Sequence, residues 1–157
     1  MLAPKHGWLL VGLVTLAALA CGALQFWQSW QRSHFNCQGE MEVFTADSHA
    51  NITLRYIFSG DKGAIILRGV VNPENGEQQA INHNVWFSFT HKGDDYFLRS
   101  ENITSNVGAK TSTKELVPVL PVFYQQSGEP FYLKIVRADG NNRLFFTSRV
   151  PSLLCKS

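Results

Sequence analysis

An uncharged apolar run near the N-terminus constrains this chain more than any other feature of its sequence. Residues Trp8 to Trp27 read WLLVGLVTLAALACGALQFW and contain no charged side chain. A helix of that length, at about 1.5 Å per residue, extends roughly 30 Å, which is the thickness of a bilayer core. Trp8, Trp27 and Trp30 stand at its ends, where tryptophan favours the membrane–water interface. The run therefore predicts a transmembrane helix over residues 8–27 with these three interfacial anchors.

Three other interpretations of the run compete with a retained anchor. A cleaved secretory signal would need a shorter apolar region, and Ala18-Leu19-Ala20 is a mediocre cleavage site. A lipoprotein signal would acylate Cys21, but the residues before Cys21 fit that motif poorly and the apolar run continues past it. A buried core helix would normally carry a polar stripe. We favour the retained anchor, and leave processing at Cys21 open.

The charges that flank the run weakly favour a cytoplasmic N-terminus, because Lys5 precedes it and Arg32 follows it. This orientation makes residues 1–7 a short cytoplasmic tail and residues 28–36 a juxtamembrane linker. Residues 37–157 then form a periplasmic domain. We expect a single-pass protein of the bacterial inner membrane that contacts the bilayer through one helix.

Two cysteines, Cys37 and Cys155, stand at the start and the end of the expected domain. An exported domain with one such pair predicts a disulfide that closes nearly the whole domain into a loop. The alternative is a reactive or metal-binding thiol pair, but the sequence has no CxxC and no nearby Cys/His cluster.

Beyond Cys37 the sequence alternates with period two and is rich in β-branched and aromatic residues. The alternation predicts inward faces such as Ile52-Leu54-Tyr56-Phe58, Val85-Phe87-Phe89, Phe131-Leu133-Ile135 and Leu144-Phe146. Polar turns join the strands, and Gly69 indicates a bulge or close packing. At least six strands are expected, over residues 51–58, 63–72, 80–90, 96–100, 131–137 and 143–150. Pro118 and Pro121 predict a short helix or an irregular crossover within residues 111–124. The fold class is therefore mainly β, an N-terminal transmembrane helix followed by a small antiparallel β-barrel or β-sandwich.

The sequence offers no constellation that points to catalysis. It contains no zinc-protease, P-loop, dinucleotide or nucleophile-elbow motif, and its five histidines have no metal-ligand spacing. Basic residues are scattered and the net charge is only +2, which argues against direct nucleic-acid binding. We therefore expect no enzyme, no metal and no cofactor. The remaining candidates are aromatic residues that fill the core, line a cavity for a small apolar ligand or face a partner: Phe58, Trp86, Phe87, Phe97, Phe131 and Phe146.

The overall layout resembles a known family. The chain combines a one-helix anchor, the string Phe35-Asn36-Cys37-Gln38-Gly39, the strand Gly63-Ala64-Ile65-Ile66-Leu67-Arg68-Gly69, the segment Leu120-Pro121-Val122-Phe123 and the final Cys155. In these features it resembles the FidL-like family of enterobacterial membrane proteins.

The resemblance implies a role beside a membrane-bound transcription activator of the ToxR type. Small partners of the ToxS type assist such activators from the periplasmic side, and some pairs form a joint β-barrel that holds a bile-salt-like ligand. The expected function is thus an accessory protein that binds or stabilises a regulator without catalysis. The alternatives are a lipocalin-like periplasmic binder of a small apolar ligand, or an envelope structural or assembly factor.

Overall fold

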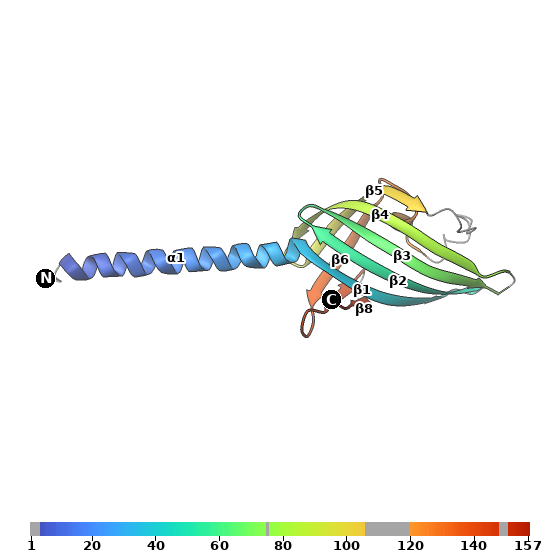
Figure 1. Cartoon of the computed structure of the whole chain (residues 1–157), viewed down its shortest axis with the longest axis horizontal. Helices are drawn as coiled ribbons and strands as arrows, with labels where there is room; N and C mark the ends of the chain where they lie inside the picture. Colours follow the sequence, from blue (N-terminus) through green and yellow to red (C-terminus); the bar gives the residue numbers. More distant parts are fainter. Residues whose placement is uncertain (1–3, 75, 106–119, 148–150) are drawn as a thin grey trace. The chain divides into compact units, whose positions relative to one another are not determined.

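The structure of the chain, a computed structural model, describes residues 4–74, 76–105, 120–147 and 151–157. The chain divides into two compact units, Met1–His34 and Phe35–Ser157. Figure 1 shows a single long helix in the first unit and a curled sheet in the second.

The first unit is one α-helix, α1, over Pro4–Ser33. Its stretch Gly7–Ser33 is long and apolar enough to cross a membrane. The stretch that sequence analysis assigned to a linker, residues 28–36, continues α1 to Ser33 and enters the first strand at His34. Trp30 stacks on His34 with ring centroids 3.7 Å apart, at the point where helix gives way to strand.

The second unit is an eight-stranded antiparallel sheet in which every strand is hydrogen-bonded to its neighbours in sequence order. This meander confirms the expected mainly β fold, and it curls into a nearly closed barrel (Figure 1). The strands are β1 His34–Phe44, β2 Ser48–Ser59, β3 Lys62–Pro73, β4 Gln79–Lys92, β5 Asp95–Ser105, β6 Pro130–Arg137, β7 Arg143–Phe146 and β8 Pro151–Cys155.

Alternation along the strands builds the core, as the sequence predicts. On β2 the residues Ile52, Leu54, Tyr56 and Phe58 are all buried, and their neighbours in the strand are more exposed. The same holds for Val85, Phe87 and Phe89 on β4 and for Leu133 and Ile135 on β6. The apolar faces of the strands therefore meet inside the barrel, where their burial supplies the main driving force for folding.

Gly69 on β3 lies in regular pairing with Ile52 on β2, so it marks close packing and no bulge. A β-carbon at this position would collide with the carbonyl oxygen of Asn51 and would lie 2.9 Å from the Cα of Ile52. Because both obstacles are backbone atoms, only glycine fits the ladder at this point.

The predicted inward face of the seventh strand is wrong. Phe145 is the buried residue of β7, whereas Leu144 and Phe146 are only half-buried. β7 is four residues long, and its pairing with β8 shifts register between Phe145 and Phe146. A short strand with three adjacent apolar residues carries too little alternation to fix which of them point inward.

A 3-10 helix, η1 (Val122–Tyr124), precedes β6 and buries Phe123 and Tyr124. Buried Ser100 of β5 fixes the loop between η1 and β6, because its hydroxyl donates to the Gln126 carbonyl at 2.7 Å and accepts from the Glu129 N–H at 3.0 Å. The helix or crossover predicted within residues 111–124 lies outside the described residues up to 119. In the described part, η1 is the only helical turn of that segment.

Candidate binding site at the barrel seam

The two ends of the sheet are fastened by a disulfide between Cys37 on β1 and Cys155 on β8. Their Cα atoms are 5.3 Å apart, within the usual range for a disulfide. Both half-cystines are buried in the core. The expected pairing is confirmed, and it links residues 118 positions apart in the chain.

One β-bridge lies beside the disulfide and joins β1 to the C-terminus. The Gln38 N–H donates to the Lys156 carbonyl at 2.8 Å, and the Lys156 N–H donates to the Gln38 carbonyl at 2.8 Å. No further rung between β1 and β8 is present in the described part of the sheet, although β1 continues to Phe44. Among the described residues, hydrogen bonds thus close one end of this seam, at Gln38 and Lys156.

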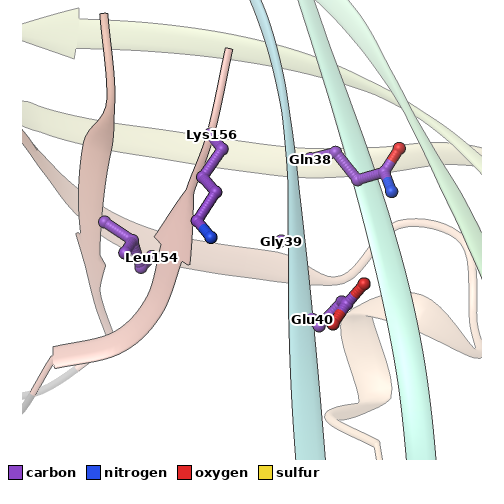
Figure 2. A pocket seen from close by; sticks show the side chains of 5 residues that line it. All are labelled: Gln38, Gly39, Glu40, Leu154 and Lys156. Atoms are coloured by element: carbon purple, nitrogen blue, oxygen red, sulfur yellow. The ribbon is translucent and has the colours of Figure 1, made fainter. Parts of the chain in front are cut away.

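A pocket of about 320 Å³ lies at the point where the two strands separate. Figure 2 shows β8 diverging from β1 below Lys156, with Gly39 and Glu40 on one side and Leu154 on the other. Gly39 forms the narrowest point, since a β-carbon there would lie 2.7 Å from the Leu153 side chain. The seam is therefore a wedge that is tight at Gly39 and wider beyond it.

A smaller cavity of about 120 Å³, partly open to the surface, has walls on both sides of the seam. Its walls include Met41 of β1 and Ser152 and Leu153 of β8, which are the strands on the two sides of the gap. Apolar groups from the rest of the barrel complete the lining: Leu54, Pro121, Phe131, Leu133 and Phe145, with Tyr56, Tyr124 and Thr147 adding hydroxyls. The cavity is smaller than the ~150 Å³ apolar cavity that holds benzene in an engineered protein.

Two of the residues that line this cavity are buried tyrosines. The hydroxyls of Tyr56 and Tyr124 lie 2.7 Å apart, and both side chains are almost fully buried. Burial raises the pKa of Tyr124 to about 12, and burial together with the nearby Tyr124 raises the pKa of Tyr56 well above its usual value of 10. Both phenols therefore stay neutral at ordinary pH, and the pair acts as one satisfied hydrogen bond in an apolar surrounding.

The six aromatic candidates from the sequence do not gather at one site. Phe58 and Phe87 belong to the core and lie 5.3 Å apart between ring centroids. Phe131 is half-buried and lines the cavity. Trp86 and Phe97 point outward, with exposed fractions of 42% and 54%. The sixth, Phe146, is half-buried on β7 and does not line the cavity.

One of the two outward aromatics, Phe97, borders a second hollow on the outside of the barrel. Phe97 and Tyr132 face each other across β5 and β6 with ring centroids 5.5 Å apart, and the Tyr132 hydroxyl donates to Asp95. A shallow groove of about 430 Å³ runs beside Phe97 and Arg99. The Arg99 guanidinium donates to the Gly128 carbonyl at 2.9 Å, which holds that side chain in place.

The residues expected at the membrane interface lie on α1. Trp8, Trp27 and Trp30 are exposed by 85%, 61% and 50% in the isolated chain. Cys21, the residue of the lipoprotein alternative, is a free and exposed thiol on the same helix.

Among the described residues, no group of three or more His, Cys, Asp or Glu side chains could hold a metal ion.

Sequence reasoning missed the parts of the seam that arise from pairing over long distances. The Gln38–Lys156 bridge and the Tyr56–Tyr124 hydrogen bond join residues that no local pattern connects. The cysteine pair was the only available signal, because a disulfide between Cys37 and Cys155 must bring their neighbours together. Polar Gln38 and Lys156 carry no motif of their own.

Comparison with known families gives one match over the second unit. The family model described as the YqeJ C-terminal domain matches residues 34–155, from the first strand to the second half-cystine. No curated protein matches the chain. The match does not bear on the FidL-like or ToxS-type resemblance, which stays a prediction.

Proposed function

The chain belongs to the YqeJ C-terminal domain family, and we propose that it is a single-pass accessory protein of the bacterial inner membrane. In this proposal its periplasmic β-domain binds and stabilises a membrane-bound transcriptional regulator of the ToxR type, without catalysis. The observation that carries the proposal is the β1–β8 seam, which a single bridge joins among the residues that the structure describes. An unpaired sheet edge offers main-chain donors and acceptors to an extended segment of another protein.

The proposed location rests on α1 and on the disulfide. The helix is long and apolar enough to span a bilayer, and a structural disulfide suits an oxidising compartment such as the periplasm. Alkaline phosphatase fused after Ser157 tests the orientation, because this enzyme is active only outside the cytoplasm. We expect an active fusion with α1 present, and an inactive fusion would overturn the topology.

The intact mass of the purified chain separates a retained anchor from processing at Cys21.

The proposed partner is tested by co-purification. The full chain, extracted in a mild detergent, is expected to retain a ToxR-type regulator encoded beside its gene at a stable ratio. A matched control keeps α1 but replaces residues 35–157 by an unrelated periplasmic domain, and we expect it to lose the regulator. Consistent absence of the regulator, even after chemical crosslinking in cells, would contradict the proposal.

The smaller cavity favours a second candidate, a lipocalin-like binder of a small apolar ligand. Its size of about 120 Å³, below the ~150 Å³ of an apolar cavity that holds benzene, limits that ligand to a molecule smaller than one aromatic ring. Xenon at saturating pressure is expected to stabilise the domain against heat. The filled variant Leu153→Phe is the control, since Leu153 lines the cavity. Equal stabilisation of both proteins would exclude the cavity as the site.

A further inference from the structure

Resting on the proposed function, we propose the chemistry of the segment that the partner brings to the seam. It is an extended segment in which apolar and basic side chains alternate, and it pairs with β1 over residues 40–44. Three features of the described residues lead to this inference: the direction of the free main-chain groups of β1, the side chains beside them, and the cavity with walls on both sides of the seam.

The direction of the main-chain groups follows from the single bridge. Both the N–H and the carbonyl of Gln38 point toward Lys156, so Gln38 is a hydrogen-bonded position at this edge. Such positions recur at every second residue of a strand. Glu40, Glu42 and Phe44 therefore direct their N–H and carbonyl groups to the same edge, where the described part of β8 forms no rung with them. The described residues of β8 therefore leave this edge of β1 available to another strand.

The side chains at the same positions set the charge of the occupant. Glu40 and Glu42 are exposed on the outer face of β1. Opposite charges at directly facing strand positions are stabilising, and like charges are destabilising. Lys156 lies at the closed end of the seam, on the far side of Gly39 from Glu42. Basic side chains are therefore favoured opposite Glu40 and Glu42.

The inward side chains set the apolar half of the pattern. Met41 and Val43 alternate with the glutamates and pack partly buried against the core. Met41 and Leu153 stand on opposite sides of the seam and both line the cavity of about 120 Å³. A strand paired with β1 would point every second side chain toward this space. A branched aliphatic side chain would fill it, which makes the occupant's inward residues apolar.

The disulfide and the bridge define where the segment enters. Cys37–Cys155 and Gln38–Lys156 hold β1 and β8 together at one end. The segment must therefore enter from the end at Phe44 and stop before Gly39, where Leu153 fills the gap. An occupant of about five residues, alternating in character, fits these limits.

The test uses three labelled peptides and the full chain in neutral detergent micelles: acetyl-KVKVKVK-amide, the acidic analogue acetyl-EVEVEVE-amide, and the non-alternating acetyl-KKVVVKK-amide. Fluorescence anisotropy is expected to show that the alternating basic peptide binds at least tenfold more tightly than either of the others. In NMR spectra, the changes in backbone amide chemical shift caused by the peptide should concentrate on residues 39–44 and 152–156. Equal binding of all three peptides, or shifts on another face, would overturn the inference.

Variants of β1 make the test specific. Glu40→Lys with Glu42→Lys is expected to reverse the preference between the basic and acidic peptides. Glu42→Pro removes the N–H that faces the seam together with the carboxylate, at an edge position that tolerates proline, so it should leave the fold intact and abolish binding. Glu42→Gln removes the charge but keeps the N–H, and it should weaken binding only in part. Retained binding by a folded Glu42→Pro protein would overturn the inference. If the regulator co-purifies with wild type and the Glu42→Pro chain alike, the proposed function stands and the seam segment is wrong.

Discussion

The hydroxyls of Tyr56 and Tyr124 lie 2.7 Å apart inside the barrel and satisfy each other. Tyr56 belongs to β2 and Tyr124 to η1, so this hydrogen bond fastens the segment before β6 to the opposite wall. A buried hydroxyl that loses its partner keeps its desolvation penalty, whereas loss of both hydroxyls removes the penalty too.

The pair predicts a non-additive mutant cycle. We expect Tyr56→Phe and Tyr124→Phe each to lower the free energy of unfolding by about 1–2 kcal/mol. The double variant should lose less than the sum of the two single variants, because neither hydroxyl remains unsatisfied. Urea unfolding of the four proteins in one detergent measures the cycle. Strictly additive losses would show that the two hydroxyls do not depend on each other.

The same pair predicts a loss of stability at alkaline pH. Burial raises the folded-state pKa of Tyr124 to about 12 and that of Tyr56 well above 10, while both titrate near 10 in the unfolded chain. The unfolded state therefore binds fewer protons above pH 10, and stability falls as the pH rises from about 10 toward 12. Each tyrosine contributes at most about 1.4 kcal/mol per pH unit. Unfolding at pH 8, 10 and 11 should show a smaller decline in the double Phe variant than in wild type, and an equal decline would contradict the shifted pKa values.

The disulfide predicts a large dependence on oxidation state. Replacing both Cys37 and Cys155 by Ser releases a loop with a sequence separation of 118 residues, and the unfolded chain gains entropy. We expect a loss of about 3–5 kcal/mol in the free energy of unfolding. The control is Cys21→Ser, which removes the free thiol on α1 and should leave the unfolding of the β-domain unchanged. An unchanged urea midpoint in the double Ser variant would show that the bridge does not stabilise the barrel.

Adjacent phenylalanines on β7 give a matched test of which side chain faces the core. Phe145→Ala should cost about 3–5 kcal/mol, because Phe145 is 1% exposed and packs edge-to-face against Tyr56 at 4.9 Å. Phe146→Ala removes the same atoms from a half-buried site and should cost no more than about 1 kcal/mol. Thermal unfolding of the two variants measures the difference. A larger loss in Phe146→Ala would restore the inward face that the sequence predicts.

The contrast between β7 and β2 shows how far sequence patterns determine this fold. β2 spans Ser48–Ser59 and places four large apolar residues in strict alternation, so its inward face was predicted correctly. β7 spans Arg143–Phe146 and offers three apolar residues in a row, so only its packing decides the face. β1 was not predicted as a strand, because its sequence HFNCQGEMEVF alternates polar residues with few large apolar ones.

The seam is less predictable than the strands for a related reason. Cys37 and Cys155 indicated that the ends of the domain meet, since a disulfide needs two thiols of suitable geometry. The register of the bridge at Gln38 and Lys156, and the gap beyond it, depend on how far the whole sheet curls. Curl and closure are properties of strand tilt and stagger across the sheet, and no local pattern in the chain encodes them.

His83 predicts the behaviour of the barrel in acid. Burial lowers its pKa below the usual 6.5, and a hydrogen bond with the Tyr124 backbone opposes this shift only in part. In the unfolded chain the same imidazole takes up a proton near pH 6.5, so the unfolded state binds more protons below that pH. The contribution of neutral His83 to stability is therefore complete above pH 6.5 and is lost as the pH falls through the lower folded-state pKa.

Two measurements test this effect of His83. In urea unfolding, we expect wild type to lose more stability than His83→Gln between pH 7.5 and 5. In an NMR titration, we expect the His83 ring to give a pKa below 6.5. A His83 ring that titrates at or above 6.5 would contradict the effect of burial at this site.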